Sequence, residues 1–311
     1  MPRRFAALLV PLAVGLLGAC GSDVATSSSA PGTAGADRLL VVTTTTQVTD
    51  FARNVGGDLV DVHPLLKPNV DPHDFEPAAA DLVALTDADV IVENGVDLEH
   101  WFEPTVESAS PHGAIVDAST GVTIRAGSED DDHGEGDPHI WQDPTNAKIM
   151  ATNIADALAT ADPANAATYR ANLAAYSAQL DQLDAEIATQ IGSLTDKKLV
   201  TNHDAFAYYV ARYGLDFVGS VIPSFDTQAE LSPSDVQDLV ARIREQGVKA
   251  IFTESSLPPK TAEAIAAEAG VKVVAGDDGL YGDSLGPAGS DGDTYLKMMR
   301  HNTRVIVQNL R

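Results

Sequence analysis

Positive charge and cysteine are both scarce in this chain, and each scarcity excludes a class of protein. The 311 residues include 20 Lys and Arg against 45 Asp and Glu, which gives a formal net charge of −25 at pH 7. A nucleic-acid partner requires clustered positive charge, so we expect no such partner. The single cysteine, Cys20, has no second thiol with which to form an internal disulfide.

The N-terminus has the pattern of a bacterial lipoprotein signal. Arg3 and Arg4 are followed by an apolar stretch, residues 5–17, that is too short to span a bilayer in the ordinary way. The small residues directly before Cys20 resemble a lipobox. We therefore expect residues 1–19 to be a signal peptide and Cys20 to carry the lipid of an exported protein. An ordinary signal peptide with an incidental cysteine is the alternative.

The rest of the chain predicts an α/β protein with two lobes. Residues 20–37, rich in Ser, Ala, Gly and Thr, are typical of a flexible tether. Beyond them, short apolar runs alternate with stretches of helical spacing, which favours parallel sheets with crossover helices. The runs are 39–42, 59–66, 90–92 and 114–116, then 199–201, 217–221, 250–253 and 271–275. We predict two (β/α)4-like lobes, at 38–162 and 193–311, that face each other across a cleft.

Residues 163–192 separate the two sets of runs and are predicted to form one long linking helix. Apolar side chains recur at steps of three and four residues from Tyr169 to Ile191. Asp162 and Pro163 supply an N-cap and a first-turn proline. At about 1.5 Å per residue such a helix is about 40 Å long. We expect it to cross both lobes and to join them rigidly.

Three histidines lie in polar segments that each follow a predicted strand. They are His73 in Asp-Pro-His-Asp-Phe-Glu-Pro, His139 in Asp-Pro-His-Ile-Trp-Gln-Asp-Pro and His203 in Thr-Asn-His-Asp-Ala-Phe. Asp283, in Leu-Tyr-Gly-Asp-Ser-Leu, follows the last strand. Ligands of open α/β sheets bind beyond the carboxyl ends of the strands, so facing lobes would bring all four side chains into the cleft. Three imidazoles and a carboxylate make a closed four-ligand site, suited to zinc above all.

Other side chains compete for these roles. Asp277 and Asp278 are close to Asp283 in the sequence and remain alternatives for the fourth ligand. Glu254 also follows a strand and is interpreted as structural or as a support for a ligand, although a general base is another interpretation. Four further histidines are interpreted as surface or packing residues: His63, His100, His112 and His301.

Residues 127–138 form a polar, acidic stretch of low complexity directly before the second histidine segment. We interpret it as a solvated loop. The alternative is transient capture of metal by His133 and its acidic neighbours.

The histidine segments resemble the metal-binding solute receptors of bacterial ABC importers for zinc and manganese. The match extends from about residue 39 to the C-terminus, with the same order and spacing of the segments quoted above, the third of which continues as Ala-Tyr-Tyr. The resemblance implies two lobes, a rigid linking helix and one ion between the lobes. It carries the ligand roles onto His73, His139, His203 and Asp283.

The third ligand position favours zinc within this family. Manganese-type members usually carry Glu where this chain has His203, and three nitrogens with one oxygen suit zinc better. The resemblance implies an exported receptor, lipid-anchored on the extracytoplasmic side, that delivers Zn(II) to an ABC permease. We expect a monomer, and a separate metal-donating protein is a further candidate partner. Many zinc-type members carry a long His-rich loop before the second ligand, whereas this chain has only His133 there.

A zinc hydrolase is the main alternative outside this class. Catalytic zinc typically has three protein ligands and an open position for water, which Asp283 would close. The sequence also lacks the His-Glu-x-x-His and Gly-x-Ser-x-Gly motifs. An adhesin is supported by surface location alone. We therefore expect a receptor and not an enzyme, with a manganese receptor of the same family as the nearest alternative.

Overall fold

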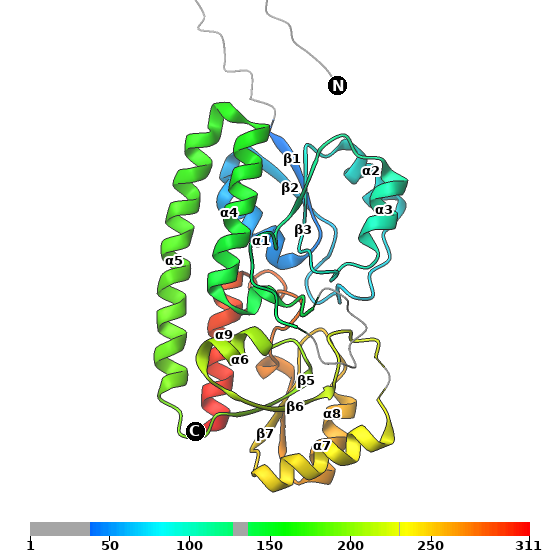
Figure 1. Ribbon diagram of the computed structural model, residues 1–311, viewed down its shortest axis with the longest axis vertical. Helices are drawn as coiled ribbons and strands as arrows, with labels where there is room; N and C mark the ends of the chain where they lie inside the picture. Colours follow the sequence, from blue (N-terminus) through cyan, green and yellow to red (C-terminus); the bar gives the residue numbers. More distant parts are fainter. Residues whose placement is uncertain (1–37, 127–135, 230) are drawn as a thin grey trace, which may run out of the picture. The chain divides into compact units, whose positions relative to one another are not determined.

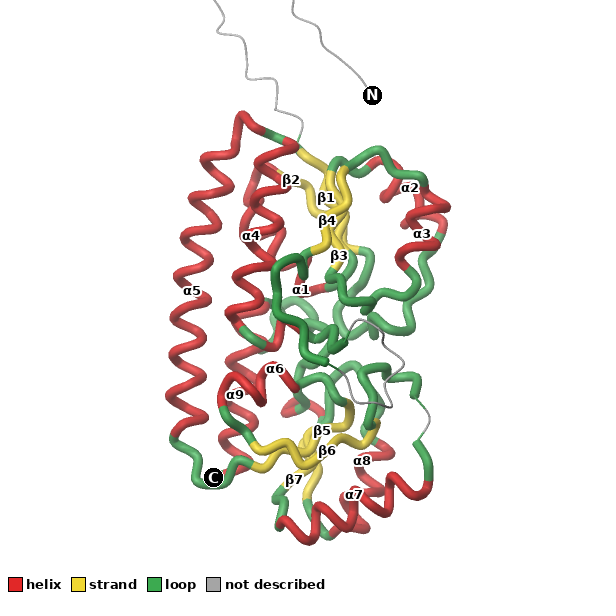
Figure 2. The backbone as a smooth tube through the Cα atoms, in the orientation of Figure 1, coloured by secondary structure: helices red, strands yellow, loops and turns green. Residues whose placement is uncertain are grey.

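The computed structural model describes residues 38–126, 136–229 and 231–311 (Figures 1 and 2). The predicted signal peptide and tether, with Cys20, lie outside the described residues, as does His133. The described part is an α/β protein with two four-stranded parallel sheets, as predicted. Arg38–Arg311 forms one compact unit in which both sheets take part.

The N-terminal lobe is built on a parallel sheet with its first strand inside. The strand order is β2-β1-β3-β4. Two crossover helices, α2 and α3, cover one face, while α1 lies on the other, beside the long helices (Figure 1). The elements are β1 (Leu39–Thr43), α1 (Thr46–Gly56), β2 (Val60–Pro64), α2 (Ala79–Asp87), β3 (Val90–Glu93), α3 (Phe102–Ala109) and β4 (Ala114–Asp117).

The C-terminal lobe repeats this topology. Its order, β6-β5-β7-β8, again places the first strand of the lobe between the second and the third. Crossover helices therefore leave the sheet on opposite faces on either side of β5, and loops after neighbouring strands diverge there to leave room for a site. The elements are β5 (Lys198–His203), α6 (Ala207–Tyr213), β6 (Asp216–Ile222), α7 (Pro233–Gln246), β7 (Ala250–Phe252), α8 (Lys260–Ala269) and β8 (Lys272–Val274).

The helix α5 (Ala166–Gly192) runs along both lobes, with α4 (Pro144–Ala161) beside the N-terminal lobe and α9 (Tyr295–Leu310) beside the C-terminal lobe (Figure 2). The predicted stripe of α5 is buried, because α5 packs on α4 beside the first lobe and on α9 beside the second.

The start of α5 differs from the prediction. Residues Pro163–Asn165 form a 3-10 turn, and the α-helix begins at Ala166. The Asp162 side chain does not cap the helix, because it accepts hydrogen bonds from Asn165 Nδ2 at 2.6 Å and from Tyr169 Oη at 3.0 Å. Pro163 therefore lies in a tight turn between α4 and α5 and not in the first turn of the long helix.

One hydrophobic core is shared by the two lobes on the side of the long helices. Tyr295, the first residue of α9, packs its ring on Phe51 of α1 with ring centroids 5.0 Å apart. Its hydroxyl donates a hydrogen bond to the Trp141 carbonyl at 2.6 Å, and its backbone N–H donates to Asp50 Oδ2 at 3.1 Å. A full separation of the lobes would expose this core, and each large buried side chain contributes about 1.5–3 kcal/mol to stability.

Among the described residues, no helix combines the length and apolarity needed to cross a bilayer.

Candidate metal centre

The structure brings the four predicted ligands together. One donor atom from each of His73, His139, His203 and Asp283 lies within 4.8 Å of all the others, and all four residues are buried. We call these four residues the histidine–aspartate cluster. His73 and His139 lie in the loops that follow β2 and β4, His203 is the last residue of β5, and Asp283 lies in the loop after β8.

Asp283 is the centre of this arrangement. Its carboxylate oxygens lie 3.3 Å from His139 Nε2, 3.5 Å from His203 Nδ1 and 3.7 Å from His73 Nε2. Burial alone would raise the pKa of Asp283, but the neighbouring His203 and His139 hold that pKa well below its ordinary value. The carboxyl group is therefore a carboxylate, available as a ligand.

Buried polar atoms that make no hydrogen bond indicate where a cation fits. Both carboxylate oxygens of Asp283 and Nε2 of His139 are buried, and none of them has a hydrogen-bond partner among the described residues. Such groups are costly unless an ion or another polar group satisfies them. Imidazole nitrogens and a carboxylate oxygen are ligands of divalent transition metals, so the residues present fit such an ion.

His139 is oriented by Asp137. The Oδ1 atom of Asp137 lies 2.8 Å from His139 Nδ1 and also accepts the His139 backbone N–H at 3.0 Å. The carboxylate therefore keeps the proton on Nδ1 and leaves Nε2 for a metal, as carboxylate–histidine pairs do in metal sites. Burial lowers the pKa of His139, but Asp283 and Asp137 more than offset this and raise it to about 9.

His203 has the opposite tautomer. Its Nε2 lies 2.8 Å from the Phe225 carbonyl oxygen, which only accepts hydrogen bonds, so Nε2 carries a proton. Nδ1 is therefore the atom that faces the cluster. Burial lowers the pKa of His203, whereas Asp283 and Glu254 raise it to about 10.

His73 belongs to a loop that is fixed by two hydrogen bonds. Its backbone N–H donates to Asp71 Oδ1 at 2.9 Å, the same Asp-x-His turn as at His139. Trp101 Nε1 donates to the Pro72 carbonyl at 2.9 Å. Asp71 also reaches the other lobe, because its Oδ2 accepts the Thr227 hydroxyl at 2.7 Å.

Asp283 is positioned by residues of the N-terminal lobe. The carbonyl of Gly282 accepts hydrogen bonds from Trp141 Nε1 at 3.1 Å, Gln142 Nε2 at 3.3 Å and Gln47 Nε2 at 3.4 Å. Sequence reasoning missed these supporting roles, and it missed Asp137 and Phe225 as well. The Asp-Pro-His sequence, which occurs at both His73 and His139, could have indicated the role of Asp137. The other supporting residues act through contacts between distant segments, which no local pattern shows.

The rival candidates lie outside the cluster. Asp277 and Asp278 are exposed in a 3-10 turn, Gly276–Asp278, and neither belongs to the cluster. His301 is buried in α9 and its Nε2 lies 2.9 Å from the Gly279 carbonyl oxygen. The remaining histidines of the described residues are exposed: His63, His100 and His112.

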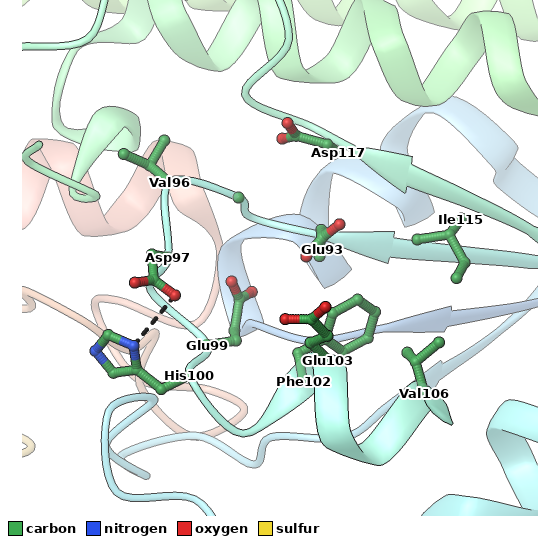
Figure 3. Close-up of a pocket in the computed structure, with 11 residues that line it drawn as sticks. Glu93, Val96, Asp97, Glu99, His100, Phe102, Glu103, Val106, Ile115 and Asp117 are labelled. Carbon is green, nitrogen blue, oxygen red and sulfur yellow. Dashed lines mark ion pairs between the residues drawn. The ribbon is translucent and has the colours of Figure 1, made fainter. Parts of the chain in front are cut away.

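A separate acidic pocket of about 400 Å³ lies in the N-terminal lobe (Figure 3). Glu93 and Asp117, at the ends of β3 and β4, and Glu103 of α3 line it. His100 pairs with Asp97 at 3.2 Å at its rim. None of the four cluster residues lines this pocket. It is distinct from the candidate metal centre, and we assign no ligand to it.

Comparison with known proteins identifies the family. Residues 41–309 match the family described as "Zinc-uptake complex component A periplasmic", ZnuA. This chain belongs to the ZnuA family. Its members are substrate-binding proteins of ABC importers and not enzymes, so the chain is an extracytoplasmic metal-binding receptor. The expectation of a receptor is therefore confirmed at this level, and the hydrolase alternative is set aside.

The relatives carry the names of different metals. The manganese ABC transporter substrate-binding lipoprotein PsaA of Streptococcus pneumoniae is 31% identical over 98% of this chain and 97% of its own length. The iron lipoprotein MtsA of Streptococcus pyogenes serotype M1 is 31% identical over 92% and 94%.

Solved structures of this fold likewise include proteins described with different metals. The periplasmic zinc binding protein TroA of Treponema pallidum has a TM-score of 0.81 and 32% identity, covering 88% of this chain and 99% of its own. A manganese-bound periplasmic protein of Candidatus Liberibacter asiaticus has a TM-score of 0.77 and 27% identity, covering 88% and 100%.

Proposed function

We propose that this chain is a zinc receptor, which captures Zn(II) with His73, His139, His203 and Asp283 and delivers it to an ABC permease. The observation that carries the proposal is the donor set: three imidazole nitrogens and one carboxylate oxygen within 4.8 Å of one another in a buried site. Nitrogen-rich sets favour zinc over manganese, and four protein ligands leave no position for an activated water. Zinc is cargo here, not a resident cofactor.

A manganese receptor is the second candidate, because relatives of this chain bear that name. PsaA is called a manganese lipoprotein, and the Liberibacter protein is described as manganese-bound. The two candidates differ in the oxygen content of the site that they require. The nitrogen of His203 is the feature that favours zinc.

The anchor and the division of the chain are also proposals. We propose that Cys20 carries a lipid after cleavage of residues 1–19, in line with the lipoprotein names of the relatives. Residues 20–37 then act as the tether. The lobes take 38–162 and 193–311, and residues 163–192 join them. The receptor acts as a monomer, with the permease as its partner and a metal-donating protein as a further candidate.

A competition experiment tests the choice of metal. Metal-free protein is mixed with equal concentrations of Zn(II) and Mn(II), passed through a desalting column and analysed for both elements. The proposal predicts about one equivalent of bound zinc and almost no manganese, because three of the four donors are imidazole nitrogens. Equal or greater retention of manganese contradicts the assignment. Exposed His63→Ala is the matched control and retains zinc like the parent.

A further inference from the structure

Tyr208 is a residue of the C-terminal lobe that reaches the segment of the second histidine. It lies in α6, which packs on the 3-10 turn Ile140–Gln142 directly after His139 (Figure 1). Its hydroxyl donates a hydrogen bond to the Asp137 carbonyl oxygen at 2.9 Å and accepts one from the Arg125 N–H at 3.0 Å. One tyrosine hydroxyl therefore joins two segments of the N-terminal lobe that are separated in the sequence.

This hydroxyl takes the place of a backbone hydrogen bond. Arg125 and Asp137 are paired in part, because the Asp137 N–H donates to the Arg125 carbonyl oxygen at 2.9 Å. In an antiparallel pair the reverse bond, from the Arg125 N–H to the Asp137 carbonyl, would complete the exchange. Here the Tyr208 hydroxyl lies between these two groups and binds both. The backbone pair at Asp137 is therefore completed by the opposite lobe.

The surroundings of the Tyr208 hydroxyl fix its position. Tyr208 is 5% exposed, and burial raises its pKa to about 12, so the hydroxyl keeps its proton and can donate. Gly136 has a φ of 104°, and a Cβ there would lie 2.4 Å from the Arg125 carbonyl oxygen, so a glycine permits this close approach. The Arg125 guanidinium carbon lies 5.9 Å from the centre of the Tyr208 ring. Ring and hydroxyl are thus both held against the N-terminal lobe.

Asp137 connects the Tyr208 hydroxyl to the metal centre. The Asp137 carboxylate orients the His139 ring, with Oδ1 2.8 Å from Nδ1, while the Asp137 carbonyl accepts the hydroxyl. Both contacts belong to one fully buried residue, so a shift of its backbone also shifts its carboxylate. Partners of a ligating histidine have a strong effect on metal affinity. The orientation of His139 therefore depends on a contact with the opposite lobe.

The first Asp-Pro-His turn receives a similar contact. The Thr227 hydroxyl of the C-terminal lobe donates to Asp71 Oδ2 at 2.7 Å. The C-terminal lobe therefore places one hydroxyl on the aspartate of each Asp-Pro-His turn. Thr227 lies in the loop after β6, whereas Tyr208 lies in a helix. Because residues on helices are held more precisely than residues on loops, Tyr208 makes the firmer of the two contacts.

We propose that Tyr208 is a positioning residue of the metal centre, which fixes Asp137, and through it the His139 ring, while the lobes are together. This inference rests on the proposed receptor function and deepens it. Separation of the lobes would withdraw the hydroxyl from the Arg125 N–H and the Asp137 carbonyl. The His139 ring would then lose its fixed orientation, and zinc would be bound less tightly. Tyr208 thus couples closure of the lobes to metal affinity.

The test compares Tyr208→Phe with the parent, using full-length protein, Zn(II) and competition with a chromophoric chelator. The substitution removes the hydroxyl and keeps the ring. We expect zinc affinity to fall roughly 10-fold, because the partner of His139 is no longer fixed. The matched control is Tyr209→Phe, the same change at the neighbouring buried tyrosine, whose hydroxyl lies 2.8 Å from Thr303 Oγ1 of α9. The control leaves zinc affinity unchanged.

A double variant shows whether the hydroxyl acts through Asp137. Asp137→Asn removes the carboxylate that orients His139, so the hydroxyl then has no carboxylate to position. In this background we expect Tyr208→Phe to change zinc affinity less than about twofold. An equal loss in both backgrounds would mean that Tyr208 acts by another route and would overturn the inference.

The exchange of a ring proton gives a further readout, which does not depend on affinity. It is measured by NMR on zinc-saturated protein with 15N-labelled histidine, where the Nδ1–H signal of His139 is identified by its absence from His139→Ala. This proton should exchange with water roughly 10-fold faster in Tyr208→Phe than in the parent or in Tyr209→Phe.

Three results would overturn the inference: parent-like zinc affinity of Tyr208→Phe, an equal loss of affinity in Tyr209→Phe, or unchanged exchange of the His139 proton. Failure of the parent itself to retain zinc would instead contradict the proposed function.

Discussion

The two lobes have the same strand order, yet they hold the metal centre in different ways. The sequence assigns two proposed ligands to each half, but in space residues of the N-terminal lobe also hold the loop that carries Asp283. Trp141, Gln142 and Gln47 bind the Gly282 carbonyl, and Thr46 Oγ1 accepts the Leu285 N–H at 2.8 Å.

The C-terminal lobe holds its proposed ligand, His203, through its own sheet. His203 is the last residue of β5, and its ring is fixed by the Phe225 carbonyl from the loop after β6. The loop that carries Asp283 is also bound to its own lobe, because Asn302 of α9 accepts the Tyr281 N–H at 2.9 Å and donates to the Tyr281 carbonyl at 2.7 Å. Position in the sequence does not tell which part of the fold controls a ligand, and His203 is the ligand that reports on the C-terminal lobe alone.

Removal of a ligand should have the largest effect and should be similar for both lobes. His139→Ala and His203→Ala each remove one of four donors, so we expect zinc affinity to fall by more than roughly 100-fold. The metal-free variants should remain folded, because each lobe keeps its own apolar contacts. Chelator competition measures the affinity and circular dichroism the folding, with exposed His63→Ala as control. Parent-like zinc binding by either variant would show that the altered histidine is not a ligand.

Acidification should weaken zinc binding through both lobes together. In the metal-free site the pKa is raised to about 9 for His139 and about 10 for His203. Below that pH each ring carries a second proton and is positively charged. Zinc must displace both protons, so affinity rises with pH toward about 9 and falls as pH is lowered. With two protons released, the binding constant should change about 100-fold per pH unit near neutrality.

The proton count is measured by calorimetry in buffers of different ionisation enthalpy. Release of fewer than one proton per zinc at neutral pH, or a binding constant equal at pH 7 and pH 5, would contradict this account of the histidines.

The hydrogen bonds to Gly282 test whether Asp283 belongs to the N-terminal lobe. Gln47→Leu and Gln142→Leu each remove one donor to its carbonyl, and we expect zinc to be released roughly 10-fold faster from each variant. Stopped-flow transfer to a chelator gives the rate. Gln228→Leu, at an exposed position of the C-terminal lobe, is the control. Unchanged release from both variants would mean that Asp283 is positioned by its own lobe.

The smallest effect concerns the hydrogen bond between the lobes at Asp71. Thr227→Val keeps the shape of the side chain and removes the hydroxyl, and the loss of one such bond costs about 1 kcal/mol, equivalent to about fivefold in release rate. The same stopped-flow assay measures it. A rate equal to that of the parent would show that this contact does not restrain the lobes.

Much of the fold was predictable because its patterns are local. Each parallel strand is a short apolar run, and the stripe from Tyr169 to Ile191 marks the buried face of α5. The four proposed ligands follow from the rule that sites lie at the carboxyl ends of such strands. The start of α5 was predicted wrongly because Asp162 uses its side chain for Asn165 and Tyr169.

The support of the site was not predictable, because it depends on contacts between distant segments. Gln47 and Gly282 are 235 residues apart, and no local pattern connects them. The same holds for Phe225, whose backbone carbonyl selects the tautomer of His203 whatever side chain residue 225 carries. Glu254 shared its position after a strand with the histidines, but its approach to His203 arises from the pairing of β5 with β7.

The most direct test of the central claim is a crystal structure of the zinc-loaded protein with anomalous data collected at the zinc edge. The account predicts one zinc ion bound by His73, His139, His203 and Asp283, with His203 ligating through Nδ1 and the Phe225 carbonyl still on Nε2. Zinc bound by the three histidines with a water in the fourth position and Asp283 turned away would contradict it.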